Sequence, residues 1–345
     1  MRRVVKRQHS STIQNFKRIT DFENESGLKQ KIELGLSSIF LVSNKIPIRD
    51  VYDFFSVENF SVLESFEELE ASYHIAKYGF YKQSMISLRI ALDIGILSIF
   101  WAIIGIESKR FKEWYSSKSD TPRKDKFFWE TLNSNKNIAI FNQKFDLKTE
   151  IGSLGALSDF VHTKGLRYSN FSDVGRKIKG QDELKDFKIW FSNFKKVVRI
   201  LEILHLLKYP TMCLDYSTEF LISKFGTLNK IPQFGGGLGD EKEYVFSFLS
   251  NKEKQLIEKL SNENDEVQHI RKYISELPDL SENEIRNLVF EEQKENIRNS
   301  GFENWNQYSH VYDNRIDDEM KSELKEWAKE KSLMSSDDIL KKHQS

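Results

Sequence analysis

One apolar stretch constrains the fold more than any other part of the chain. Residues 90–106, IALDIGILSIFWAIIGI, contain a single charged residue, Asp93, and the uncharged part from Ile94 to Ile106 covers 13 residues. A helix that spans a bilayer needs about 20 apolar residues. We therefore interpret the stretch as a helix buried in a protein core, with no membrane contact, and the rest of the chain must supply apolar surface to cover it.

The remaining sequence supplies that surface with helical periodicity. Apolar residues between 62 and 76 recur every three or four positions, which predicts one face of a helix. The chain of 345 residues has only 16 Gly and 5 Pro to interrupt such elements. Further helices are predicted over 80–106, 150–162, 182–209, 214–225, 281–299 and 320–331. Ser281 with Glu284 three residues later is a capping box that begins the helix over 281–299, and Gly301 ends it. The sequence therefore predicts an all-α fold, a helical bundle with a smaller helical C-terminal appendage.

Charge and glycine content divide the chain near residues 231–240, IPQFGGGLGD. The net charge is zero, but residues 240–345 hold 25 acidic and 16 basic residues, whereas residues 1–239 hold 27 acidic and 36 basic residues. The acidic part could dock on the basic part, or the basic part could face an anionic partner. We expect an irregular segment with a basic arm over 1–60, a helical bundle over 61–230, a Gly-rich linker over 231–240 and an acidic helical region over 241–345.

The N-terminal 18 residues contain six basic residues and no acidic residue. They could form an arm that touches nucleic acid or a solvated chain end. Residues 8–15 are polar, which argues against a secretory signal. The chain has one cysteine, Cys213, so it has no internal disulfide. We expect a cytoplasmic protein without a cofactor.

Arg89 and Asp93 are charged residues at the start of the apolar stretch. They are four residues apart and so share a helix face. Charges among apolar neighbours are stable only when they are paired. The pair could fix how helices pack, or it could bind a substrate, and the first interpretation needs no function.

A histidine and a basic loop follow the helix predicted over 150–162. His162 lies at the edge of the apolar face and Asp159 lies further round the helix. An imidazole can act as acid or base near neutral pH, although a histidine at a helix C-terminus can also act simply as a cap. The loop that follows is a candidate nucleic-acid-binding segment through Lys164, Arg167, Arg176, Lys177 and Lys179.

The helix predicted over 182–209 contains a second arginine and histidine. Ser192, Lys195, Arg199, Glu202 and His205 recur every three or four residues and predict one continuous polar stripe on the protein surface. Such a solvated stripe explains Arg199 and His205 without any catalysis.

Two carboxylate–histidine pairs could suggest a metal site. Glu70 with His74, and Asp159 with His162, have helical spacing. Four-helix di-metal proteins need a full set of inward carboxylates in addition. That set is missing here, so we expect no metal.

Residues 68–101 resemble a known family. A helix ends near Tyr78, Gly79-Phe80-Tyr81 follows, and the next helix carries Leu88-Arg89 and Leu92-Asp93. This order resembles the Gly-x-Tyr, Leu-Arg, Leu-Glu pattern of bacterial HEPN-like helical bundles, with Asp93 where the family often has Glu. The later segment 157–165, LSDFVHTKG, resembles the ending of some relatives, so the resemblance covers about residues 61–225.

The resemblance implies RNA binding or metal-independent RNA cleavage, often in phage defence or toxin–antitoxin systems. In the family the catalytic residues work across a dimer. His162 would then act as general acid or base beside Asp159, and Arg89 or Arg167 would stabilise charge on the phosphate. The expected partners are RNA, a second copy of the chain or another protein. The alternative is a non-enzymatic interaction or accessory protein, whose acidic C-terminal region docks on the basic bundle or on a partner.

Overall fold

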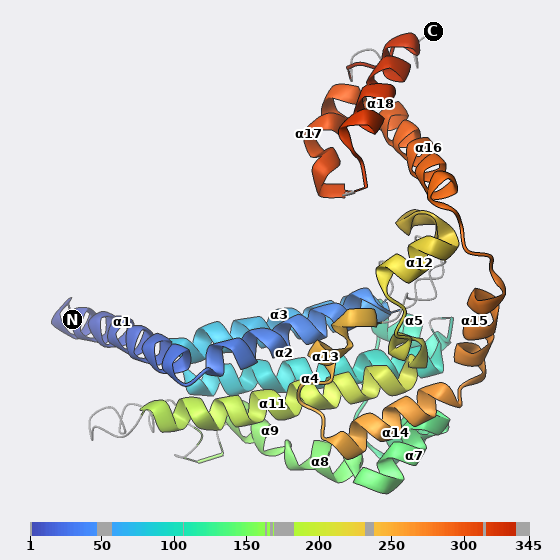
Figure 1. Ribbon diagram of the computed structural model, residues 1–345. Coiled ribbons are helices and arrows are strands. Elements are labelled where there is room, and N and C mark those ends of the chain that lie inside the picture. The colour runs from blue at the N-terminus through green and yellow to red at the C-terminus, as the bar shows by residue number, and fades with distance from the viewer. Residues whose placement is uncertain are drawn as a thin grey trace. The chain divides into compact units, whose positions relative to one another are not determined.

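The structure is a computed structural model, and it describes residues 2–46, 57–105, 107–162, 164–165, 168, 183–231, 238–312 and 315–335. These residues form helices and no β-strand, which confirms the all-α prediction. They divide into two compact units (Figure 1). The first unit is Met1–Asp215 with Gln233–Gln268, and the second is Tyr216–Pro232 with His269–Ser345.

Long helices form the body of the first unit (Figure 1). They are α1 (Arg2–Glu25), α2 (Leu28–Asn44), α3 (Val57–Lys77), α4 (Tyr81–Ile104) and α11 (Glu183–Lys208). Shorter helices pack against them: α5 (Lys109–Tyr115), α6 (Lys126–Ser134), α7 (Lys136–Phe145), α8 (Leu147–Ser153), α9 (Ala156–Val161), α13 (Lys242–Val245) and α14 (Asn251–Asn262). The helix α15 (Asp265–Glu276) begins in the first unit and ends in the second.

The apolar stretch lies in α4, at the centre of the first unit. α4 contacts α3, α11, α9 and α6, and Leu88, Ile96, Phe100 and Trp101 are fully buried. Of the described helices, α4 alone has the length and hydropathy of a membrane span, and more than half of its apolar window is covered by the protein. It has the surroundings of a core helix.

Two glycines let the long helices approach each other. Gly79 takes a positive φ of 81° in the turn between α3 and α4, a backbone conformation that residues with a side chain rarely adopt. Gly95 faces α11, where an added Cβ would overlap Leu201 and lie 3.0 Å from Ser65 Oγ. Both positions set how closely α4 can pack on its neighbours.

The prediction of an irregular N-terminal segment is wrong for residues 2–44, which form α1 and α2. Ile19, Ile32 and Ile39 are buried in the main core. α1 is also held by Glu23, a fully buried carboxylate that accepts hydrogen bonds from Tyr73 Oη at 2.9 Å and Lys77 Nζ at 2.5 Å. Tertiary contacts with α3 stabilise a helix whose own sequence is mostly polar.

The second unit has its own small core. It contains α12 (Thr218–Phe225), α16 (Glu282–Ser300), α17 (Phe302–Tyr312) and α18 (Asp318–Glu330). The predicted capping box at the start of α16 is confirmed, because Ser281 and Glu284 bond each other reciprocally. The predicted helix end at Gly301 is confirmed as well. Apolar residues of α16, α17 and α18 form most of the core, among them Val289, Ile297, Trp305, Met320 and Leu324.

The unit boundaries differ from the division expected at residues 231–240. The segment 233–268 belongs to the first unit, because Val245, Phe246 and Ile257 are buried in its core, whereas 216–232 belongs to the second unit. Within the linker expected over 231–240, residues 232–237 lie outside the described residues. The helix predicted over 150–162 is divided into α8 and α9 near Gly155.

Candidate nucleic-acid interface

Arg89 and Asp93 form the predicted ion pair on α4. Arg89 Nε donates to Asp93 Oδ2 at 2.7 Å, and Lys124, from the segment before α6, bonds the other carboxylate oxygen. Burial lowers the pKa of Lys124, and the charge of Asp93 opposes that shift. Asp93 is thus shared between two cations and ties α4 to the α6 region, which is a packing role.

His162 is exposed at the C-terminal cap of α9. Its backbone N–H donates to Ser158 O at 3.0 Å. Asp159 instead pairs with Lys164, whose Nζ lies 2.9 Å from Asp159 Oδ1, and this hydrogen bond raises the pKa of Lys164. Among the described residues, no hydrogen bond or ion pair joins His162 to Asp159 or to Arg89. The structure therefore does not assemble the three expected catalytic residues through direct contacts.

Of the expected nucleic-acid-binding residues, Lys164 is exposed. Arg167, Arg176, Lys177 and Lys179 lie outside the described residues. His74 is exposed and Glu70 is partly exposed, with His74 Nε2 3.8 Å from Glu70 Oε1. Within the described ranges, no group of three His, Cys, Asp or Glu side chains could hold a metal ion.

The prediction of a continuous surface stripe on α11 is wrong for its C-terminal half. Glu202 and His205 are 0% and 1% exposed, while Lys195 and Ser192 are exposed. Arg199 lies at the transition and bonds Glu150 of α8 and Glu253 of α14. Helical spacing places residues on one face, but it cannot say where neighbouring helices cover that face.

The buried half of the stripe is a polar network inside the core. Ser38 Oγ donates to Glu202 Oε1 at 2.5 Å, and burial raises the pKa of Glu202 well above its ordinary range. His205 Nδ1 donates to Leu201 O at 2.7 Å, so Nε2 can accept from Ser98 Oγ at 3.1 Å. Burial lowers the pKa of His205 to about 4, and the imidazole is neutral at neutral pH. Neither group reaches solvent, so both serve packing.

The exposed half of α11 carries a different feature, four lysines that we call the lysine row. They are Lys185, Lys188, Lys195 and Lys196, and all four are exposed. At 3.6 residues per turn they lie within an arc of about 100°, and they extend over about 16 Å of helix. Lys188 Nζ and Lys195 Nζ lie 5.1 and 5.3 Å from the ring centroids of Phe22 and Phe191, so aromatic contacts hold both stems along the surface.

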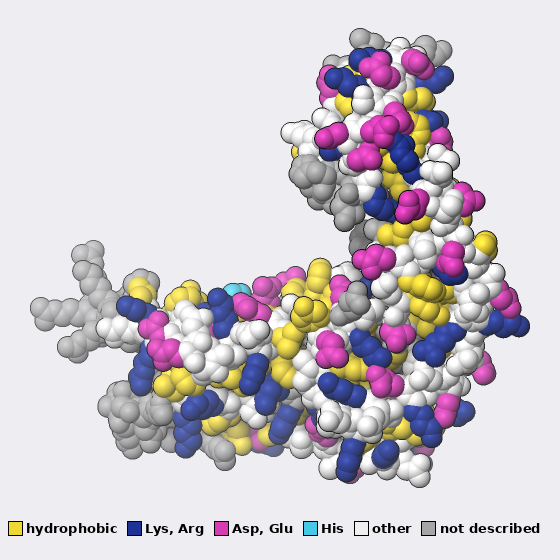
Figure 2. Space-filling view, in the orientation of Figure 1, with side chains coloured by type: hydrophobic (Ala, Val, Ile, Leu, Met, Phe, Trp, Pro, Cys, Tyr) yellow, Lys and Arg dark blue, Asp and Glu magenta, His cyan; other side chains and the backbone are white. Residues whose placement is uncertain are grey.

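The lysine row lacks the acidic partners that several other exposed lysines have. No lysine of the row forms an ion pair with a described acidic residue. By contrast, Lys259, Lys272 and Lys329 each lie within ion-pair distance of a glutamate one helical turn away. Figure 2 shows Lys and Arg side chains recurring along the part of the first unit where α11 runs, with few acidic side chains among them. Unpaired positive charge on a helix face is the electrostatic feature of an anion-binding surface.

A second basic feature is a hollow of about 480 Å³ beside α6. It is lined by Lys124, Asp125, Lys126, Trp129, Glu130, Asn133 and Lys148. Lys148 Nζ lies 5.7 Å from the Trp129 ring centroid. Asp125 caps α6 and Glu130 lies 3.6 Å from Lys126, so internal contacts already offset much of this charge. The lysine row is therefore the stronger candidate.

Comparisons with family models, with curated proteins and with solved structures found no match. The HEPN-like resemblance therefore stays a prediction from the residues that carry it. The residues of the lysine row could have been found from the spacing of lysines in the predicted helix. Which half of that helix is exposed could not, because the covering residues lie far away in the sequence.

Proposed function

We propose that this protein binds single-stranded RNA through the lysine row of α11. The observation that carries the proposal is the alignment of four exposed lysines, without described acidic partners, on one helix face. Lysines that neutralise phosphates release counterions, and this release supplies most of the free energy of sequence-independent binding. The choice of RNA over DNA follows the HEPN-like resemblance, which also suggests phage defence or a toxin–antitoxin system as the setting.

Other features of the first unit support the proposal. The row begins three residues after Asp182, where the chain leaves the segment that contains Arg176, Lys177 and Lys179. Ile189, which is half-exposed, and Ser192 lie on α11 between the lysines and give bases an apolar and a polar contact. Such a surface tracks a phosphate backbone and discriminates little between bases.

The salt dependence of binding tests the proposal. A short labelled single-stranded RNA is titrated with the full chain between about 50 and 200 mM salt, and the slope of log affinity against log salt is measured. Replacing the four lysines of the row by Gln removes four phosphate contacts. Each phosphate contact on a single strand contributes about 0.7 to this slope, so the slope of the variant should be shallower by about 3.

A matched control separates the row from net charge. Lys259, Lys272, Lys325 and Lys329 are also exposed, and their replacement by Gln removes the same charge from α14, α15 and α18. The control variant should keep the slope of the original protein. An equal slope for the row variant and the original protein would overturn the proposal. An equal decrease in slope in the row variant and the control variant would overturn it as well.

The same samples distinguish binding from cleavage. If the protein also cleaves RNA, the length of the RNA after the titration will fall, and His162→Ala will restore it, because His162 would supply the acid or base. Intact RNA at saturation with both proteins indicates binding alone.

A further inference from the structure

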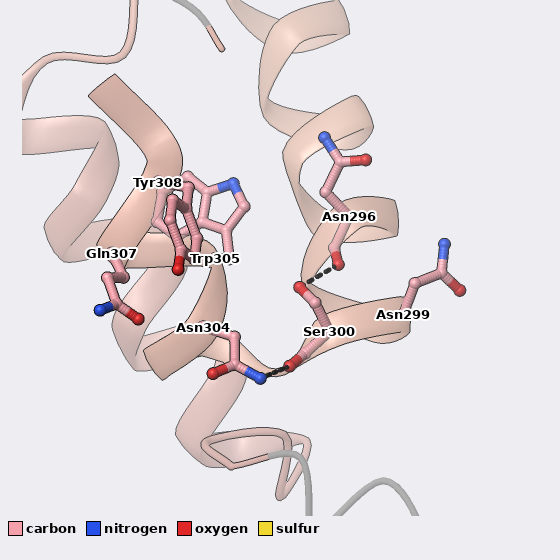
Figure 3. Close-up of a pocket in the computed structure, with 7 residues that line it drawn as sticks. All are labelled: Asn296, Asn299, Ser300, Asn304, Trp305, Gln307 and Tyr308. Carbon is pink, nitrogen blue, oxygen red and sulfur yellow. Dashed lines mark hydrogen bonds between the residues drawn. The ribbon is translucent and has the colours of Figure 1, made fainter. Parts of the chain in front are cut away.

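The second unit contains a cavity of about 560 Å³ where α16 turns into α17. Gly301 makes this turn with a φ of 81°. Asn296, Asn299 and Ser300 contribute from the last turns of α16 (Figure 3). Asn304, Trp305, Gln307 and Tyr308 contribute from α17. The volume lies in the range of small-molecule sites.

The lining carries no charged side chain. It consists of four amide side chains, one serine, one tryptophan and one tyrosine. A site for a phosphate or a carboxylate would need a cation or several free backbone N–H groups. The lining suits an uncharged ligand with both donors and acceptors, because each amide can donate and accept at once.

Several of these polar groups are available to a ligand. Asn304 Nδ2 donates to Ser300 O at 3.1 Å and Ser300 Oγ donates to Asn296 O at 2.8 Å, and these bonds fix the turn. The side chains of Asn299 and Gln307 are exposed and bond no described residue. They can therefore exchange water for a ligand without breaking a contact within the described structure.

The two aromatic rings have different roles. Trp305 is buried, and its Nε1 donates to Gln293 Oε1 at 2.9 Å, so it supports the cavity from the core. Tyr308 is 51% exposed and stands beside Trp305 at the cavity (Figure 3). An exposed ring of this kind is a stacking surface for a planar ligand.

We propose that this cavity binds the adenine base of a nucleoside. The base stacks on Tyr308, and Gln307 or a neighbouring Asn bonds its edge. Asn and Gln match the adjacent donor and acceptor of adenine, whereas Arg and Lys match guanine and Asp and Glu match cytosine. Only the first pair of residue types lines this cavity. The site belongs to the second unit and does not depend on the RNA-binding proposal.

Calorimetric titration of the full chain with adenosine, guanosine, cytidine and a neutral disaccharide tests the assignment. Adenosine should bind more tightly than the other three. Tyr308→Ala should weaken adenosine binding roughly 5- to 100-fold, the effect expected for loss of one base–aromatic stack. Tyr308→Phe keeps the ring and should retain the affinity.

Two further variants complete the test. Gln307→Glu replaces the amide donor by an acceptor, so it should weaken adenosine binding and reduce the preference over cytidine. Tyr244, on α13 of the first unit, is also 51% exposed, and Tyr244→Ala should leave binding unchanged. Absence of adenosine binding, equal binding of the disaccharide, or adenosine binding that is insensitive to Tyr308→Ala would overturn the proposal.

Discussion

The buried histidine of α11 should make the first unit sensitive to mild acid. His205 is fully buried, and burial lowers its pKa from 6.5 to about 4. The unfolded chain therefore binds a proton as the pH falls through 6.5, while the folded chain does not bind it until near pH 4. The stability of the folded state is complete above pH 6.5 and decreases as the pH falls towards 4.

The size of this loss follows from the two pKa values. The titration of His205 lowers the free energy of unfolding by about 2 kcal/mol between pH 8 and pH 5. The decrease approaches about 3 kcal/mol below pH 4. Carboxylates also titrate in acid, so the loss due to His205 must be measured as a difference. His205→Gln keeps a polar side chain of similar length and removes the titrating group.

Urea unfolding at pH 5 and pH 8, followed by hydrogen exchange of α11 peptides, measures this difference for the first unit alone. The original protein should lose about 2 kcal/mol more than His205→Gln between the two pH values. The comparison does not depend on how far the substitution itself destabilises the protein. An equal loss in the two proteins would refute the buried, neutral state of His205.

Three further substitutions test the packing of the same unit by urea unfolding. Gly95→Ala should cost about 1–3 kcal/mol, because the new Cβ overlaps Leu201, and an unchanged midpoint would contradict the close α4–α11 contact. Arg199→Ala should lower the free energy of unfolding by about 3 kcal/mol, because Glu253 stays buried without its cation. A decrease below about 1 kcal/mol, the range of surface ion pairs, would show that the pair is solvated. Glu202→Gln should raise stability at pH 8, because burial raises the pKa of the folded carboxyl and so opposes its ionisation, whereas the unfolded carboxyl ionises freely; a lower stability of the variant at that pH would contradict the assignment.

The sequence predicted the elements that local patterns determine. The helix expected over 182–209 is α11, which ends just before Pro210, and the capping box at Ser281 begins α16 as expected. The i, i+4 spacing of Arg89 and Asp93 correctly predicted an ion pair. These features depend on residues within one or two helical turns of each other.

Features that depend on distant residues were not predictable. Lys124 reaches Asp93 across 31 positions and Glu253 reaches Arg199 across 54. α1 forms on a mostly polar sequence because Glu23 docks on Tyr73 and Lys77 of α3. The amide-rich segment 296–308, which lines the cavity at Tyr308, can be recognised in the sequence. Whether it encloses a cavity depends on how α16 and α17 pack.

The central claim is that the lysine row contacts RNA, and lysine footprinting tests it most directly. The full chain is acetylated with and without saturating single-stranded RNA, and each lysine is quantified by mass spectrometry. Lys185, Lys188, Lys195 and Lys196 should become protected when RNA is bound, whereas exposed Lys259 and Lys272 should react equally in both samples. Unchanged reactivity of the row in the presence of bound RNA would contradict the proposed interface.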